Sequence, residues 1–118
     1  PIYVICSDSF RTGKYRDVPE SLKDKVYAEY KMKNHEGYCS GEEGCEIDHI
    51  ISLYLGGSND IKNLFPQSFS TQPYNAHKKD ALEVRLHKMV CSGEISLKEA
   101  QKEISTDWIK AYEKYVNK

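Results

Sequence analysis

The sequence predicts a single small α+β domain. A strand-like run at residues 45–51 precedes a glycine-rich turn and a second short strand, whereas apolar residues recur at helical spacing in three other segments. A chain of 118 residues has the length of one domain and can bury roughly two-thirds of its unfolded surface around one core. We therefore expect one unit spanning residues 1–118, with a two-stranded hairpin set among helices.

The N-terminal part of the chain predicts a short strand and one helix. The apolar run Ile2–Ile5 favours a strand in an otherwise irregular stretch. Ser21 followed by Asp24 is typical of a helix start, and apolar residues follow at helical spacing. We expect the first helix over residues 21–33.

The central segment predicts two strands joined by a chain reversal. Residues 56–60, Gly-Gly-Ser-Asn-Asp, tolerate positive φ, which lets the chain turn and bring Asn63 back toward Asp48. Pro66 lacks a backbone N–H, and we expect it to end the second strand.

The C-terminal half predicts two helices. Residues 75–91 place several aliphatic side chains on one face, and Gly93 fits the end of that helix. Ser96 and Glu99 form a capping box, after which an apolar stripe continues to Tyr112. We expect this last helix over residues 96–116, packed on the core.

The composition argues against a membrane-spanning protein and places nucleic-acid binding in local patches. Charged residues make up 30% of the chain, and no apolar run approaches the ~20 residues that a membrane helix needs. A net charge of -1 is unusual for a protein that neutralises phosphates. Any DNA contact must therefore come from local basic clusters, one near Arg16 and one along the helix at 75–91.

Four cysteines, Cys6, Cys39, Cys45 and Cys91, occur without a C-x-x-C spacing. Two disulfides can form in three ways, and the sequence does not select one. We favour oxidised cysteines and an exported protein, periplasmic or secreted. Two alternatives remain open: four free thiols in a cytoplasmic protein, or a zinc ion held by Cys39, Cys45 and His35.

Groups suited to metal-assisted hydrolysis lie close together in the centre of the chain. Asp48 and His49 are adjacent, Asn63 follows the turn, and Asn75 and His77 open the next helix. Carboxylate and amide oxygens suit Mg²⁺ or Mn²⁺, and a neutral imidazole accepts a proton near neutral pH. The pattern indicates a cation site beside a general base.

These segments resemble the HNH endonucleases, and most closely a bacterial subgroup. The similarity includes E-x-D-H at residues 46–49, G-G-S-N-D-x-x-N-L-x-P-Q at 56–67 and N-A-H-x-K-D-x-L-E at 75–83, and it extends over nearly the whole chain. It implies a ββα-metal (HNH) core at about residues 45–91 with additional flanking helices. It also implies a metal-dependent endonuclease that hydrolyses phosphodiester bonds of DNA with low sequence specificity.

The resemblance implies a role for each matching residue. His49 would be the general base, Asp48 the first metal ligand, and Asn63 a residue that completes the metal shell or orients the imidazole. Asn75 is the preferred ligand from the helix, with His77 as the substitute. The implied cofactor is Mg²⁺, or Mn²⁺ in its place. Three basic residues on the same helix are the expected nucleic-acid contacts: Lys78, Lys79 and Arg85.

Two geometric conditions accompany these roles. Neighbouring residues on a strand point to opposite faces, so the strand must bend, bulge or end at Asp48 and His49 for both to serve one site. Asn75 and His77, two positions apart, lie on different sides of a regular helix. Both can reach one cation only if the helix starts irregularly.

The motifs also leave other functions open. Double-stranded DNA is the favoured substrate and RNA an alternative, for a monomer without membrane association. A nuclease toxin restrained by an immunity protein would use the same site. A catalytically silent nucleic-acid-binding module would bind DNA without cleaving it. A disulfide-stabilised structural or inhibitory domain would not bind DNA.

Overall fold

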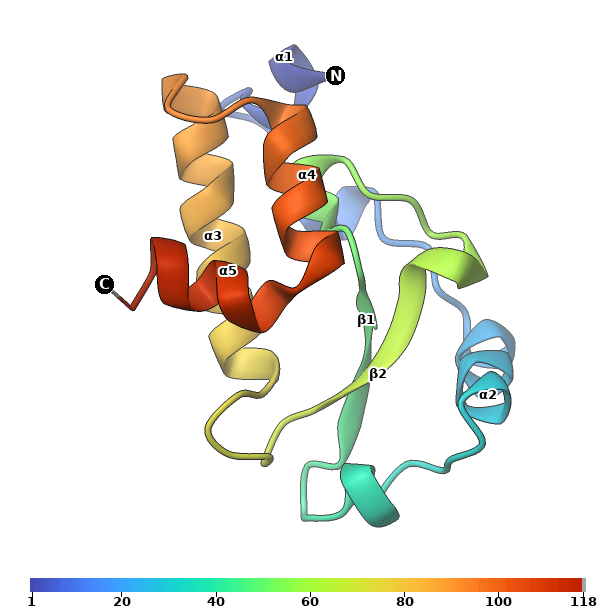
Figure 1. Cartoon of the computed structure of the whole chain (residues 1–118). Coiled ribbons are helices and arrows are strands. Elements are labelled where there is room, and N and C mark those ends of the chain that lie inside the picture. The colour runs from blue at the N-terminus through green and yellow to red at the C-terminus, as the bar shows by residue number, and fades with distance from the viewer. Residues whose placement is uncertain (118) are drawn as a thin grey trace.

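The computed structural model describes residues 1–117 and has an α+β fold around one antiparallel hairpin (Figure 1). The strands β1 (Cys45–His49) and β2 (Leu64–Ser68) pair with Asp48 opposite Phe65. Helix α3 (Ala76–Ser92) follows β2, so the central part of the chain has the order ββα. The predicted α+β class is confirmed.

The hairpin lies between a layer of helices and a single helix (Figure 1). Helices α3, α4 (Leu97–Thr106) and α5 (Trp108–Tyr115) pack on one another on one side, and α2 (Glu20–Glu29) contacts β2 on the other. Burying each large aliphatic side chain contributes about 1.5–3 kcal/mol. The buried core is formed by nine residues from α1, the hairpin loop and the helical layer: Ile5, Leu55, Leu82, Leu86, Val90, Ala100, Ile104, Ala111 and Tyr112.

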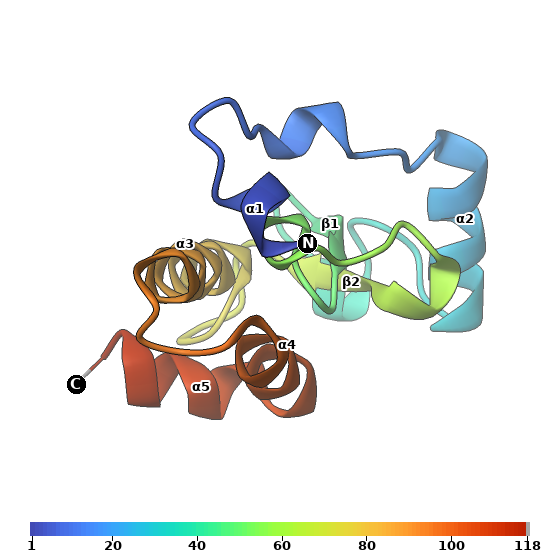
Figure 2. The same cartoon turned by 90° about the horizontal axis from the view of Figure 1, so that it is seen from above.

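The N-terminal segment runs from the helical layer to α2 (Figure 2). Its first element, α1 (Ile2–Ile5), is a single helical turn, so the prediction of a strand there is wrong. A four-residue apolar run fits either structure, and in the folded chain no strand pairs with it among residues 1–117. Ile5 is instead buried in the core, next to the helical layer.

The predicted C-terminal helix over residues 96–116 is two helices, α4 and α5, that meet at Asp107. Asp107 is extended, with φ -161° and ψ 92°, and its side chain accepts a hydrogen bond from the Lys110 N–H. This cap starts a new helix in a different direction. The apolar periodicity continues across the break, which is why the sequence suggested one helix.

Other boundaries differ less from the expected ones. The helix expected over 21–33 ends at Glu29, and the helix expected over 75–91 spans Ala76 to Ser92. Pro66 does not end the second strand but lies inside it, opposite Ile47. A two-stranded sheet consists of edge strands, where proline is tolerated.

Two disulfides, Cys6–Cys91 and Cys39–Cys45, use all four cysteines. They settle the connectivity, and they contradict both the free-thiol alternative and a zinc ion on Cys39 and Cys45. Disulfides form and persist in oxidising environments, which is where exported proteins fold. Within residues 1–117 no helix has the length and apolar character needed to cross a bilayer.

Candidate functional site

The end of β1 places Asp48 and His49 in one cleft. The strand ends at His49, so the alternation that would separate adjacent side chains does not continue past it. Both residues line a cleft of about 1000 Å³ between β1 and α2, and both also line a second hollow of about 270 Å³. The geometric condition for a shared site is therefore met for this pair.

The cleft carries charges of both signs. Its α2 side is lined by basic residues from the N-terminal segment and from α2 and the turn after it: Arg16, Lys23, Lys31 and Lys33. Its other side is lined by carboxylates from β1 and α3: Glu46, Asp48, Asp80 and Glu83. The α2 side is not purely basic, because Glu20, Asp24 and Glu36 also line the cleft there.

His49 is buried, with 4% of its surface exposed, and its ring is held by one hydrogen bond. Nε2–H donates to Asn59 Oδ1 at 2.9 Å. Burial lowers the pKa of His49 below the usual value of 6.5, although the Asn59 hydrogen bond and the Asp48 charge act in the opposite direction. The imidazole is consequently neutral near neutral pH, the form that accepts protons.

Asn59, which holds this ring, links three segments of the chain. Its Nδ2 donates to the Tyr15 carbonyl oxygen at 2.8 Å, and its Oδ1 also accepts the Asp17 N–H at 3.2 Å. Sequence reasoning treated Asn59 only as a turn residue. Nothing local distinguishes it from Ser58, because the two backbone groups that orient its side chain lie more than 40 residues away in the chain.

Asn63 holds the loop between the strands. Its Oδ1 accepts the Ile51 N–H at 2.8 Å, and its Nδ2 donates to the carbonyl oxygens of Ile51 and Ser58 at 3.0 and 2.8 Å. Gly57 packs so closely in this loop that a Cβ there would overlap the Ile51 carbonyl oxygen. Asn63 thus fixes the loop that carries Asn59, and its own side chain bonds to backbone atoms instead of contacting His49.

Asp48 is buried and is engaged by two groups. Its Oδ1 accepts the His49 N–H at 2.8 Å. Its Oδ2 lies 3.1 Å from Lys79 Nζ but makes no well-aligned hydrogen bond, and it is the one buried side-chain oxygen or nitrogen without such a partner among residues 1–117. Asp48 is therefore paired in charge, while one of its oxygens keeps an unused lone pair.

Lys79, an expected phosphate contact, is 1% exposed and lies beneath the cleft. Its Nζ donates to the His49 carbonyl oxygen and to Glu83 Oε2, each at 2.7 Å. Burial lowers the pKa of Lys79, but the Asp48 and Glu83 carboxylates outweigh it and leave that pKa raised. The structure thus makes Lys79 an internal cation. The i, i+4 spacing to Glu83 was the signal for this pair.

Two carboxyl groups of the cleft have a pKa far above the usual carboxyl value. Burial, followed by the charges of Asp48, Asp80 and Glu83, raises the pKa of Glu46 to about 7. Burial also raises the pKa of Glu83 to about 7, although the Lys79 ammonium favours its ionised form. Burial is therefore the main reason that both groups hold a proton more tightly than an exposed carboxyl group does.

The two residues expected as ligands from the helix do not line the cleft. Asn75 caps α3: its Oδ1 accepts the Lys78 N–H at 3.2 Å, and its Nδ2 donates to the Thr71 carbonyl oxygen at 3.0 Å. His77 is exposed, and its ring centroid lies 5.5 Å from that of Phe69. Neither side chain is brought to Asp48 and His49.

The other expected nucleic-acid contacts also lie outside the cleft. Lys78 Nζ lies 5.5 Å from the centre of the Tyr112 ring and so faces α5. Arg85 is half-buried further along α3 and is absent from the residues that line the cleft within 1–117. The cations on the cleft walls come instead from the N-terminal segment, α2 and the residues after it.

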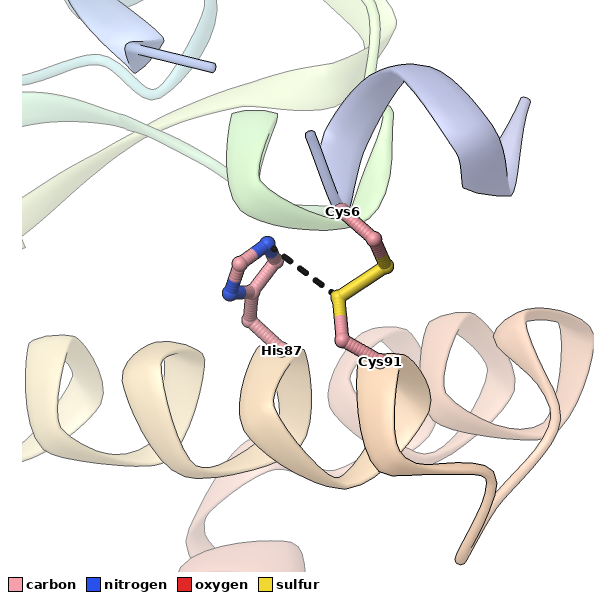
Figure 3. A group of neighbouring side chains, drawn as sticks. All are labelled: Cys6, His87 and Cys91. Carbon is pink, nitrogen blue, oxygen red and sulfur yellow. Dashed lines mark hydrogen bonds between the residues drawn. A yellow bond between two sulfur atoms is a disulfide. The ribbon is translucent and has the colours of Figure 1, made fainter. Parts of the chain in front are cut away.

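A second cluster joins the N-terminal segment to α3 (Figure 3). His87 Nε2–H donates to the Ile5 carbonyl oxygen at 2.7 Å and lies 3.6 Å from Cys91 Sγ. The ligand atoms of Cys6, His87 and Cys91 lie within 4.8 Å of one another, a spacing that could hold a metal ion. In this structure the two sulfurs bond to each other, and the cluster anchors the N-terminal segment.

The fold and the site define a small α+β protein with an imidazole and a buried carboxylate at the end of a hairpin strand. Comparisons with protein-family models, curated proteins and solved structures give no match. The resemblance to HNH endonucleases accordingly stays a prediction from the motifs.

Proposed function

We propose that the protein is a metal-dependent endonuclease that hydrolyses phosphodiester bonds of DNA, with the cleft at the end of β1 as its active site. Double-stranded DNA is the favoured substrate. The observation that carries the proposal is the meeting of a neutral, oriented imidazole at His49 with the carboxylate of Asp48 in one cleft. A general base beside an anionic cation site is what hydrolysis of a phosphodiester requires.

The residues of the cleft suit a hard divalent cation, Mg²⁺ or Mn²⁺. Mg²⁺ is usually held by one or two carboxylates together with water and substrate phosphate. Asp48 and Asp80 line both hollows and would hold the ion. The buried Asp48 Oδ2 has no aligned hydrogen bond. Burial is the main cause of the raised pKa of Glu46, and the neighbouring carboxylates add to it, a contribution that a bound cation would offset.

The remaining steps belong to groups of the chain itself. A phosphodiester resists attack because its charge repels the nucleophile and its leaving alkoxide is poor. When bound, the cation would stabilise the charge that develops on the leaving oxygen, which lowers such barriers by several kcal/mol. His49 would take the proton of the attacking water, giving 5′-phosphate and 3′-hydroxyl products without a covalent intermediate.

Phosphate binding is assigned to the opposite wall of the cleft. Lys31 and Lys33 line it, and neither forms an ion pair with any other residue of the range 1–117. Lys23 is already paired with Glu20 at 3.3 Å. A DNA strand lying along this wall would bring a phosphate close to Asp48 and Asp80, the carboxylates that would hold the cation.

One observation favours a second candidate, a DNA-binding module without catalysis. Lys79 already supplies positive charge to Asp48, at 3.1 Å. If this ion pair keeps divalent cations away, the cleft would bind DNA through Lys31 and Lys33 but would not cleave it. Metal binding separates the two candidates.

The test is cleavage of supercoiled plasmid by the purified, disulfide-bonded protein with Mg²⁺ or Mn²⁺, beside a chelator control. We expect the His49→Ala variant to lose at least about 100-fold in rate, the range in which a general base contributes. His77→Ala is the matched control, because His77 is exposed and lies outside the cleft. It should retain wild-type activity.

Two results would count against the nuclease, and a third would count against the proposed site. Equal cleavage by wild type, His49→Ala and chelated samples would indicate contamination. Absence of cleavage, combined with Mn²⁺ binding undetectable by calorimetry, would favour the silent module. A loss of activity in His77→Ala as large as in His49→Ala would return the site to the residues that the motif implied.

A further inference from the structure

We propose that Asn59 is a positioning residue that holds the His49 imidazole with its proton on Nε2 and leaves Nδ1 to accept the proton of water. The role of Nδ1 rests on the proposed nuclease function, whereas the position of the proton does not. Asn59 itself touches no reacting atom. It acts through the ring, and its own orientation is set by the N-terminal segment.

Two backbone groups determine the orientation of the Asn59 amide, one a hydrogen-bond donor and the other an acceptor. Oδ1 accepts the Asp17 N–H at 3.2 Å, and Nδ2 donates to the Tyr15 carbonyl oxygen at 2.8 Å. Reversing the amide would place its NH₂ group against an N–H and its oxygen against a carbonyl. The backbone at Tyr15 and Asp17 therefore selects the orientation in which Oδ1 faces His49.

That orientation decides which ring nitrogen carries the proton. Oδ1 can only accept, so the 2.9 Å contact requires a hydrogen on His49 Nε2. A neutral imidazole has one N–H, which leaves Nδ1 with its lone pair. No residue in the range 1–117 forms a hydrogen bond to Nδ1. Nδ1 is also not one of the fully buried side-chain atoms that lack a hydrogen-bond partner. The free nitrogen thus remains reachable from the cleft that His49 lines.

The N-terminal segment can hold the amide because it is itself anchored. The Cys6–Cys91 disulfide fixes its start to α3, and the Phe10 ring stacks on that of Tyr15 with centroids 5.5 Å apart. Asp17 then leads directly into α2. The position of the proton on the base is thereby coupled to a segment more than 30 residues before it in the chain.

The first test is the tautomer of His49, read from long-range ¹⁵N–¹H correlations of uniformly labelled protein at a pH where the ring is neutral. The His49 signals are assigned by comparison with His49→Ala. We expect a protonated Nε2 and an unprotonated Nδ1 in wild type. Asn59→Ala removes the acceptor and should give averaged ¹⁵N shifts, the signature of two tautomers. Asn59→Asp keeps an acceptor for Nε2–H, although its second oxygen faces the Tyr15 carbonyl oxygen, and it should keep the proton on Nε2 wherever the ring is neutral.

Ser58→Ala is the matched control, because Ser58 lies in the same loop and, within residues 1–117, its hydroxyl bonds only to the Asp60 N–H. It should leave the His49 signals unchanged. If Asn59→Ala unfolds the protein, the wild-type spectrum and the Asn59→Asp spectrum still decide the question. A proton on Nδ1 in wild type overturns the proposal, as does an unchanged spectrum in folded Asn59→Ala.

The second test is kinetic and applies once cleavage is established. Asn59→Ala frees the orientation of the ring as well as its tautomer, which lowers kcat without weakening substrate binding, so the variant should lose about 10- to 100-fold in kcat with KM within about twofold of wild type. Asn59→Asp should recover part of that loss. A wild-type protein that cleaves nothing would refute the nuclease, whereas the tautomer experiment would still test Asn59. Equal kcat in wild type and Asn59→Ala would overturn the catalytic part of the inference.

Discussion

Lys79 Nζ lies 3.1 Å from Asp48 Oδ2, in a position where the lysine side chain is 1% exposed. The same nitrogen also donates to Glu83 and to the His49 carbonyl oxygen. One ammonium group thus neutralises carboxylates from a strand and a helix and holds the end of that strand. A buried ion pair is costly to break, because the remaining partner is left as an uncompensated charge.

Lys79→Met should destabilise the protein by about 3 to 5 kcal/mol, since Asp48 and Glu83 would lose their common cation. The measurement is urea denaturation followed by circular dichroism. Lys88→Met is the control, because Lys88 is exposed on the same helix, and its free energy of unfolding should change by less than about 0.5 kcal/mol. Equal, small effects in both variants would show that the buried pair does not stabilise the fold.

Glu46→Gln should make the free energy of unfolding depend less on pH. The folded-state pKa of Glu46 is raised from 4.5 to about 7, so the folded protein binds the proton more tightly than the unfolded chain between these values. Wild-type stability should therefore fall as pH rises through this window. Glu46 is partly exposed, so after allowance for solvent screening the variant should exceed wild type by about 1 to 2 kcal/mol above about pH 8.

The difference between Glu46→Gln and wild type should vanish below pH 4.5, where Glu46 is protonated in both states. Chemical denaturation at the two pH values gives the comparison. Glu42→Gln, in an exposed loop, is the control for a general effect of removing one charge. A stability gain that is the same at acidic and alkaline pH would contradict the assignment to Glu46.

The two disulfides should contribute unequally to stability. Cys6–Cys91 spans a sequence separation of 85 residues, for which the chain-entropy model gives about 4.5 kcal/mol, whereas Cys39–Cys45 spans 6 residues and gives about 2 kcal/mol. Denaturation of the two double alanine variants tests the order. Both cysteines of the short loop are buried, so lost packing adds to their effect. A larger loss from the short loop would mean that packing outweighs chain entropy.

Replacing Lys31 and Lys33 together by glutamine should weaken DNA binding about tenfold at low salt. It should also reduce the slope of log affinity against log salt by about 2, because two phosphate contacts are lost. Fluorescence anisotropy with a short labelled duplex measures both quantities. The pair Lys78→Gln/Arg85→Gln is the control, since neither residue lines the cleft within residues 1–117. A larger effect from the control pair would place the DNA on the α3 side.

Local patterns in the sequence were sufficient for the hairpin, for α3 and for the position of Asp48 and His49 at the end of the first strand. Each depends on residues within one short segment, where turn chemistry and periodicity operate. The break at Asp107 escaped prediction because the apolar stripe continues through it. The strand expected at Ile2–Ile5 failed because a strand needs a partner, and pairing is not a local property.

The parts of the site that the sequence did not reveal depend on distant contacts. Lysine is almost never fully buried unless it is paired. The sequence alone therefore predicts a surface cation at Lys79, because it does not show that Asp48 and Glu83 lie beside the ammonium group. The sequence predicts only a turn residue at Asn59, because Tyr15 and Asp17 come close to it only when the N-terminal segment is folded. The side chains of Asn63 and Asn75 form hydrogen bonds to nearby backbone atoms. Asparagine commonly has this role in turns and at helix caps.

The bonds between Asn59 and the N-terminal segment end on main-chain atoms, the carbonyl of Tyr15 and the N–H of Asp17. The bonds themselves use no side-chain atom of these two residues, although the Tyr15 ring still anchors the segment by stacking on Phe10. Only proline at position 17 would abolish one of them, because it has no N–H to offer. The side chain of Asp17 can therefore vary between related sequences, while Asn59 keeps the His49 imidazole in place through main-chain atoms.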